Sequence, residues 1–135
     1  MAKIITGNCC CGDVAFTLED CFSKFYFCHC EQCRKLTGTA HASNLFTSPK
    51  NIHWIHGVDK IKRYDHKERS FSKAFCGNCG SGLPFLSKSG ESLIVPAGSL
   101  NEEPSKKIDA QIFYSEQTEW HKSSLTVAKV SGFPK

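Results

Sequence analysis

Cys28-His29-Cys30-Glu31-Gln32-Cys33-Arg34 is the stretch of sequence on which the prediction of the fold depends. Its three cysteines have the spacing of metal ligands, as do two further pairs, Cys9 with Cys11 and Cys76 with Cys79. Seven of the nine cysteines thus fall into three clusters. A closed tetrahedral zinc site takes four thiolates, whereas a catalytic zinc commonly has three protein ligands and one open position. The count therefore predicts two zinc ions per chain, one structural and one catalytic.

The Cys-x-Cys spacing suits a β-strand. Residues i and i+2 of a strand point to the same face, so both sulfurs of Cys9-x-Cys11, or of Cys28-x-Cys30, can reach one ion. We therefore expect both pairs on strands, with the intervening Cys10 and His29 pointing the other way.

The spacing leaves open which cysteines share an ion. Cys76-x-x-Cys79 needs a tight turn, for which Gly77 and Gly80 supply conformational freedom. In one grouping, Cys30-x-x-Cys33 and Cys76-x-x-Cys79 form a zinc ribbon and leave Cys9, Cys11 and Cys28 over. In the other grouping, Cys9, Cys11, Cys76 and Cys79 close one site, and Cys28, Cys30 and Cys33 hold the other. Compactness favours the second grouping, because the triplet already lies on one short segment.

Length and composition predict one domain, residues 1–135, with 40% apolar and 22% charged residues. No apolar run approaches the roughly 18 residues of a membrane span, and the N-terminus lacks the apolar region of a secretory signal. We therefore predict a cytoplasmic protein with reduced cysteines and no membrane partner. The net charge of +4 suits a small anion but is too weak to favour nucleic acid as a partner.

The hydrophobic pattern indicates a mainly β fold. Val14, Phe16 and Leu18 alternate with Ala15 and Thr17, which is typical of a half-buried strand. Short β-rich runs recur at 25–28, 42–46, 52–55, 61–64, 71–75, 93–95 and 111–114. Short helical turns are expected only after Cys33 or near 123–130.

The cysteine motifs resemble those of the family of glutathione-dependent formaldehyde-activating enzymes, which also includes centromere protein V. The matching elements are Gly7-x-Cys9-x-Cys11-Gly12, Cys28-His29-Cys30-x-x-Cys33-Arg34 with Gly38, and Phe75-Cys76-x-x-Cys79-Gly80. Weaker matches are Gly98-Ser99-Leu100 and Ile112-Phe113 ahead of Trp120. Family members often carry His where this chain has Gln111, and Asp where it has Asn101.

The resemblance implies a compact, zinc-stabilised antiparallel β-sheet fold similar to that of methionine sulfoxide reductase B. It implies a structural zinc at Cys9, Cys11, Cys76 and Cys79, and a catalytic zinc at Cys28, Cys30 and Cys33. It also implies an activity like that of S-(hydroxymethyl)glutathione synthase, in which glutathione or another small thiol reacts with formaldehyde or another small aldehyde.

Two functions compete. Three thiolate ligands blunt the Lewis acidity of zinc and favour a soft fourth ligand, so an incoming thiol would lose its proton there and stay nucleophilic. This favours a carbon–sulfur lyase that forms and splits thiol–aldehyde adducts. The alternative is a zinc-stabilised binding module that contacts protein or nucleic acid without catalysis. Arg34 and Lys35 either hold a glutathione carboxylate or are ordinary surface cations.

The remaining candidates are predicted to be structural. We expect packing or surface histidines at His29, His53 and His56, and non-ligand thiols at Cys10 and Cys21. An apolar core is expected to include Phe22, Phe25, Tyr26 and Phe27, and a solvated strand face is expected at Lys60-Ile61-Lys62-Arg63.

Overall fold

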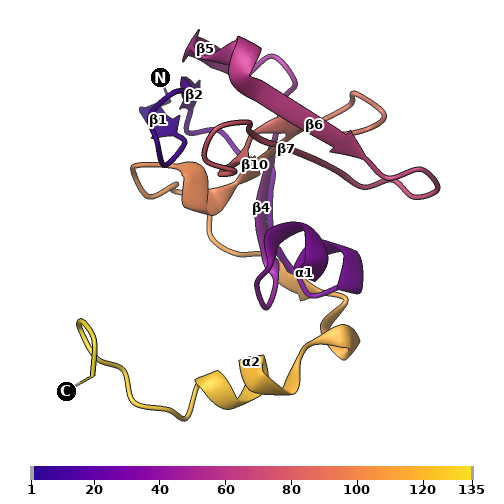
Figure 1. Ribbon diagram of the computed structural model, residues 1–135, viewed down its shortest axis with the longest axis vertical. Coiled ribbons are helices and arrows are strands. Elements are labelled where there is room, and N and C mark those ends of the chain that lie inside the picture. Colours follow the sequence, from indigo (N-terminus) through magenta and orange to yellow (C-terminus); the bar gives the residue numbers. More distant parts are fainter. Residues whose placement is uncertain (1, 135) are drawn as a thin grey trace.

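Three small β-sheets form the body of the protein (Figure 1). The computed structural model describes residues 2–134. The first sheet has the order β1 (Ile4–Asn8), β2 (Ala15–Glu19) and β5 (His53–His56). The second has the order β11 (Ala110–Ile112), β3 (Lys24–Cys28), β4 (Ala42–Thr47), β10 (Leu93–Pro96) and β9 (Phe85–Leu86). The third has the order β6 (Ile61–Asp65), β7 (Ser72–Cys76) and β8 (Gly82–Leu83).

The prediction of a mainly β fold with antiparallel sheets is confirmed, since β11 and β3 are the one parallel pair among the described strands. Strands β1, β8 and β9 were not predicted from the sequence. The run predicted at 111–114 ends early, because Phe113 adopts a left-handed conformation with φ of 53°.

Helices are few and short. They are α1 (Glu31–Thr37), α2 (Glu119–Ser124) and the 3-10 turns η1 (Val58–Lys60), η2 (Ala97–Ser99) and η3 (Tyr114–Glu116). A helical turn was expected after Cys33, but α1 begins at Glu31 and already includes Cys33. The turn expected near 123–130 is wrong for most of its length, because α2 ends at Ser124. In Figure 1, α2 and the segment after it lie below the sheets, far from the N-terminus.

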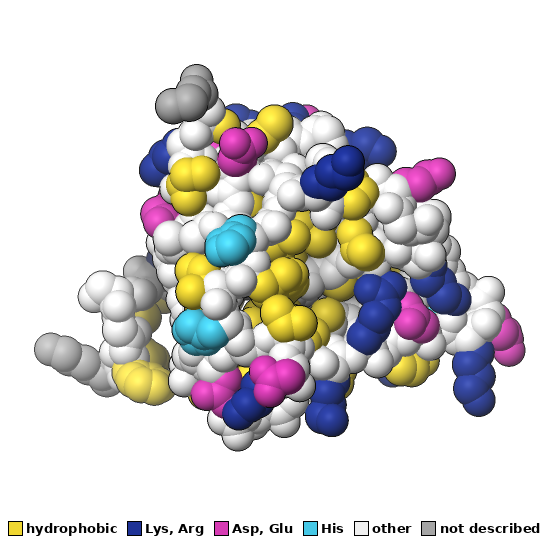
Figure 2. Space-filling view, turned by 90° about the horizontal axis from the view of Figure 1, so that it is seen from above, with side chains coloured by type: hydrophobic (Ala, Val, Ile, Leu, Met, Phe, Trp, Pro, Cys, Tyr) yellow, Lys and Arg dark blue, Asp and Glu magenta, His cyan; other side chains and the backbone are white. Residues whose placement is uncertain are grey.

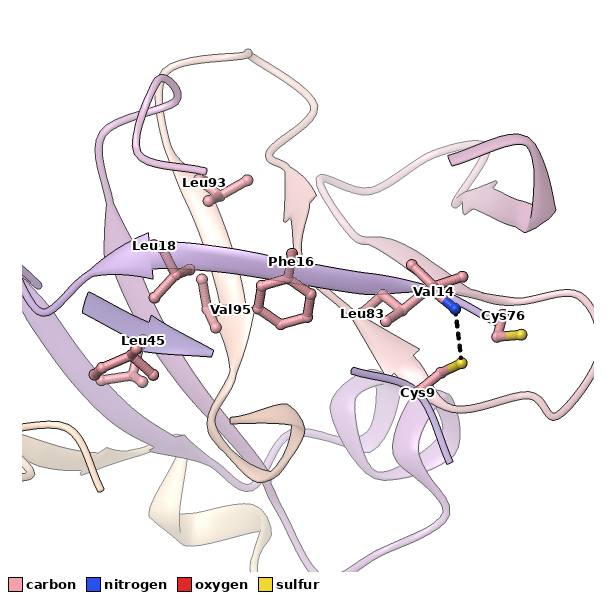
Figure 3. Packing of buried hydrophobic residues seen from close by; sticks show 10 residues of the cluster. Cys9, Val14, Phe16, Leu18, Leu45, Cys76, Leu83, Leu93 and Val95 are labelled. Atoms are coloured by element: carbon pink, nitrogen blue, oxygen red, sulfur yellow. Dashed lines mark hydrogen bonds between the residues drawn. The ribbon is translucent and has the colours of Figure 1, made fainter. Parts of the chain in front are cut away.

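The main core lies between the first two sheets. Phe16 and Leu18 of β2 point into it and pack with Leu45 of β4 and Val95 of β10 (Figure 3). Phe16 also meets Trp54 of β5 edge to face, with ring centroids 5.6 Å apart. Cys9 and Cys76 belong to the same buried cluster, so two of the predicted metal ligands lie at the edge of the core.

The end of β5 fixes the loop between β1 and β2. Gly57 has φ of +89°, and a Cβ atom there would lie 2.0 Å from the carbonyl oxygen of Asp13. The neighbouring His56 Nδ1 lies 3.0 Å from the same oxygen. Only glycine therefore allows β5 to pack this closely against the loop.

We predict that Gly57→Ala destabilises the protein much more than Gly90→Ala. Both glycines have a positive φ, but a Cβ at Gly90 would meet nothing within 4 Å. Gly90→Ala should therefore cost only the left-handed strain of roughly 1–2 kcal/mol. Gly57→Ala should add a steric penalty of about 1–3 kcal/mol. Urea unfolding of both variants measures the difference, and equal losses would show that the packing against Asp13 is not tight.

Two candidate metal centres

The first centre is the sulfur quartet, formed by Cys9, Cys11, Cys76 and Cys79. Their sulfur atoms all lie within 4.8 Å of one another. The Cys9–Cys11 and Cys11–Cys76 Sγ atoms are 3.6 Å and 3.8 Å apart. Zn–S bonds of 2.3 Å in a tetrahedron place the sulfurs about 3.8 Å apart, so the donor set fits zinc. The structure thus groups the cysteines as a quartet and a triplet, not as the zinc ribbon of the other grouping.

A hairpin loop, not a strand, brings Cys9 and Cys11 together, which corrects the sequence prediction. Strand β1 ends at Asn8, and the Gly12 N–H donates to the carbonyl of Cys9 (3.1 Å). The Cys9 N–H donates to Val14 O (3.0 Å), and the Val14 N–H donates to Cys9 Sγ (3.2 Å). The loop thus curls round the first sulfur.

Cys76 and Cys79 flank the predicted tight turn. Cys76 is the last residue of β7, and the Gly80 N–H donates to its carbonyl (2.8 Å). Gly80 has φ of +78°, whereas Gly77 is required for space, because a Cβ there would lie 3.0 Å from Lys60 O. The Ser81 hydroxyl, 3.2 Å from Cys79 Sγ, is the main group that lowers the pKa of Cys79, to about 5.

The second centre is the sulfur triplet, formed by Cys28, Cys30 and Cys33, all of them buried. Cys28 is the last residue of β3, as expected, but Cys30 has left the strand. It is instead the N-cap of α1, and its Sγ accepts the Cys33 N–H (3.4 Å). The Cys28 and Cys30 sulfurs are 3.5 Å apart, which again is close to the spacing of zinc ligands.

The triplet stabilises one thiolate even without a metal. A hydrogen bond from the Cys33 thiol is the main cause that lowers the pKa of Cys28, to about 6. The same bond raises the pKa of Cys33, and burial raises the pKa of Cys30. A bound cation would replace the protons that Cys30 and Cys33 retain.

A cavity of about 770 Å³ opens beside the triplet. Cys28 and Cys33 line it, and the cavity also reaches Cys9 of the quartet. Phe71 and Ile112 pack against the triplet and line the same cavity. This cavity could not be found from the sequence, because its walls come from eight strands and the helix α1.

His29 is completely buried, so its expected packing role is confirmed. Its Nε2 lies 2.8 Å from Oε1 of Gln111, and its ring lies 4.9–5.2 Å from those of His41, Tyr114 and His121. Burial, then the nearby His29 and His121, lower the pKa of His41. No sequence pattern indicates this cluster, because its members lie far apart along the chain.

The positions that differ from the usual family pattern have structural partners. Gln111 contacts His29, and the Asn101 side chain donates to Thr6 Oγ1 (3.0 Å) and Asn8 Oδ1 (2.9 Å). Arg34 Nε donates to the carbonyl of His29 (3.3 Å), and Lys35 is exposed. None of these four side chains lines the cavity.

The other candidates mostly follow expectation. Cys10 and Cys21 are exposed and lie outside the two sulfur groups. His53 and His56 lie on strand β5. Phe22 and Phe25 pack against the core, but Phe27 stacks on His41 and Tyr26 lines the cavity, so the expected core role of Tyr26 is wrong. The basic side chains at 60–63 are exposed. On the face in Figure 2, Lys and Arg lie apart with acidic side chains between them.

Comparison with known proteins agrees with this arrangement of sulfurs on β-sheets. Residues 4–116 match the model of the family described as glutathione-dependent formaldehyde-activating enzyme, and the chain belongs to that family. A crystal structure of a Rhodobacter sphaeroides protein, a structural genomics target, is similar in fold, with a TM-score of 0.61 and 19% identity. The match covers 78% of this chain and 99% of that one. A search of curated proteins found no match.

The described helices are all too short or too polar to cross a lipid bilayer.

We predict that the two centres fail differently. The quartet ties the β1–β2 loop to the end of β7, and metal binding in small zinc domains supplies on the order of 10 kcal/mol of folding free energy. Cys76→Ala should therefore unfold or aggregate the protein, whereas Cys30→Ala should stay folded with one zinc. Circular dichroism and elemental analysis of both variants provide the measurement. Unfolding of Cys30→Ala as readily as Cys76→Ala would show that the triplet is structural.

We further predict two zinc ions per chain, unchanged in Cys10→Ser and Cys21→Ser. Both thiols are exposed and lie outside the two sulfur groups. Elemental analysis after purification with zinc under reducing conditions gives the count. A mild chelator should remove one equivalent first, from the triplet with its three ligands. Loss of zinc in Cys10→Ser would contradict the loop geometry described above.

Proposed function

We propose that the protein is a zinc-dependent carbon–sulfur lyase that forms and splits adducts between glutathione and a small aldehyde such as formaldehyde. The observation that carries this proposal is that the triplet opens onto a cavity through Cys28 and Cys33. Membership of the formaldehyde-activating family supports glutathione and formaldehyde as the reactants.

The triplet would hold the catalytic zinc through Cys28, Cys30 and Cys33. A zinc ion held there supplies one further coordination position, at which a thiol loses its proton readily. The reaction itself is an addition: the thiol sulfur bonds to the aldehyde carbon, and the thiol proton ends on the carbonyl oxygen. The reverse reaction splits the same carbon–sulfur bond.

The chain's own residues prepare this site. Cys30 holds the first turn of α1 in place through the Cys33 N–H, and β3 fixes Cys28. Phe71 and Ile112 cover the sulfurs with apolar surface, which lowers the local dielectric and strengthens charge interactions there. Arg34 lies one residue beyond Cys33 and is proposed to attract a carboxylate of glutathione.

The quartet is proposed to hold a structural zinc, which makes two ions per chain. We take residues 1–135 as one domain of this kind, with a fold like that of methionine sulfoxide reductase B, and propose that it acts in the cytoplasm, where thiols stay reduced.

A binding module remains the second candidate, and a fourth protein ligand at the triplet would favour it. Within residues 2–134, no further cysteine, histidine or carboxylate joins the triplet. This favours catalysis, because a site with three protein ligands leaves a position for substrate.

We predict that glutathione binds the zinc-loaded protein much more tightly than S-methylglutathione. The two share every charged group, but a thioether cannot become a thiolate ligand. Calorimetry should show the difference in the parent protein and not in Cys30→Ala. Equal affinities in the parent protein would remove the metal–thiol contact and support the binding module.

A further inference from the structure

The five-stranded sheet has two apolar faces. One face packs into the core through Leu45, Leu93 and Val95. Antiparallel sheets with one packed face commonly carry polar, solvated residues on the other. Here the second face carries half-buried Phe46, Ile94 and other apolar side chains, and it forms the floor of the cavity.

Strand register places these side chains in a row. Ile94 of β10 lies directly opposite Phe46 of β4 on one side and Phe85 of β9 on the other. Side chains that lie opposite one another in a sheet point to the same face. The floor is therefore a continuous apolar strip across three strands.

The same face leads to the triplet. Tyr26 lies two residues before Cys28 on β3, so both side chains point to this face. Cys28 pairs with Ala42 and, on its other side, with Ile112. All four residues line the cavity. The row formed by Tyr26, Asn44 and Pro96 joins the apolar strip to the metal-ligating sulfur of Cys28.

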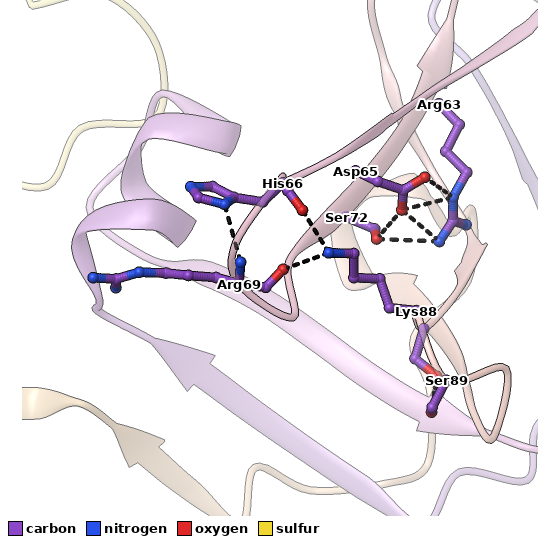
Figure 4. A network of polar contacts seen from close by, with 8 residues as sticks. Arg63, Asp65, His66, Arg69, Ser72, Lys88 and Ser89 are labelled. Carbon is purple, nitrogen blue, oxygen red and sulfur yellow. Dashed lines mark hydrogen bonds and ion pairs between the residues drawn. The ribbon is translucent and has the colours of Figure 1, made fainter.

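The opposite wall is held firmly. Phe71 and Ser72 line the cavity where the β6–β7 loop enters β7. Lys88 donates to the carbonyls of His66 and Arg69 in that loop (Figure 4). The Ser72 hydroxyl donates to Asp65. These bonds keep Phe71 over the triplet.

The cavity offers little to a multiply charged ligand. Of the described residues that line it, Lys73 alone is charged, and its Nζ donates to the carbonyl of Leu36. Glutathione carries two carboxylates, and burying a carboxylate without a partner is costly. Arg34 and Lys35, the cations next to the triplet, lie outside the cavity lining.

We propose that the aldehyde partner carries an apolar substituent, an alkyl chain or an aromatic ring, which lies along this floor. This inference rests on the proposed function and specifies the class of aldehyde that would react there. The charged ends of the thiol stay outside, beside α1. A one-carbon aldehyde would leave empty a cavity whose volume is in the usual range for whole small-molecule ligands, about 300–1,000 Å³.

The reaction balances without a further reactant. The carbon–sulfur bond forms as the carbonyl π bond opens, and the thiol proton ends on the new hydroxyl group. The apolar substituent takes no part in the bond changes, so it affects only binding along the floor.

The test uses a homologous series, because simple aliphatic aldehydes have similar intrinsic reactivity. Acetaldehyde, hexanal and decanal, with formaldehyde as the one-carbon reference, are mixed with glutathione and the zinc-loaded protein, and exchange NMR gives the catalysed rate above the spontaneous one. We expect kcat/KM to rise about fourfold for each added methylene until the floor is covered.

Matched variants locate the effect. Ile94→Asp places a charge in the centre of the floor and should remove the dependence of kcat/KM on chain length. Phe85→Ser on edge strand β9 is a milder second variant, in which we expect kcat/KM to depend less steeply on chain length than in the parent protein. Ile55→Asp introduces the same charge on exposed β5, outside the cavity, and should behave as the parent protein does.

Binding provides a readout besides activity. In ¹⁵N–¹H spectra, 1-hexanol should shift amide signals on β4, β9 and β10 of the parent protein and not of Ile94→Asp. A catalysed rate independent of chain length would overturn the inference and leave the proposed function standing. No catalysis with any aldehyde would overturn the proposed function and the assignment of an aldehyde with it, even if 1-hexanol binds.

Discussion

The close approach of four cysteine sulfurs constrains the whole structure. Two come from a hairpin loop and two from a turn, and Cys11 and Cys76 are 65 residues apart in the chain. Four thiolates at such distances repel one another unless a cation lies between them. With the proposed zinc at the quartet, folding and metal binding there would be one process. Because Cys9 and Cys76 are also part of the buried core, the quartet joins the first sheet to the third.

The two centres use the same ligand chemistry in different surroundings. The quartet is completed by the protein, whereas the triplet has three sulfurs and a cavity beside them. The two are linked through β7, which ends in Cys76 and whose Lys73 donates to the carbonyl of Leu36 in α1. The N-cap of α1 is Cys30, so the helix positions one sulfur of the triplet. The helix is in turn anchored by Lys73 of β7, the strand that ends in Cys76 of the quartet.

Much of this arrangement could be predicted from the sequence, because local rules govern it. Cysteine spacing identified the seven cysteines, the compactness of the triplet segment favoured their division into quartet and triplet, and alternation identified β2 through Phe16 and Leu18. Spacing could not distinguish a strand from a loop around Cys9, since both can bring residues i and i+2 together. The outcome depended on bonds between Cys9 and Val14 that close the loop.

The cavity could not be predicted for a different reason. Its floor depends on which strands are neighbours and in what register, and nothing local to Phe46 or Ile94 specifies that they face each other. The run Leu93–Pro96 is apolar at every position, which indicates a strand that is covered on both faces. The run does not indicate which elements cover those faces. The burial of His29 against Gln111 likewise depends on the parallel pairing of β3 with β11.

The long separation within the quartet also sets the order in which the two centres can be completed during synthesis. The triplet needs only the segment from Cys28 to Cys33 and has all of its ligands as soon as that segment leaves the ribosome. Cys9 and Cys11 emerge earlier still, but Cys76 and Cys79 join them only after the whole stretch from 12 to 79 has been synthesised. During that interval the N-terminal thiols, including the neighbouring Cys10, are open to oxidation and to metal exchange. If both centres hold zinc as proposed, the nascent chain needs a reducing, zinc-supplied environment well before it has a core.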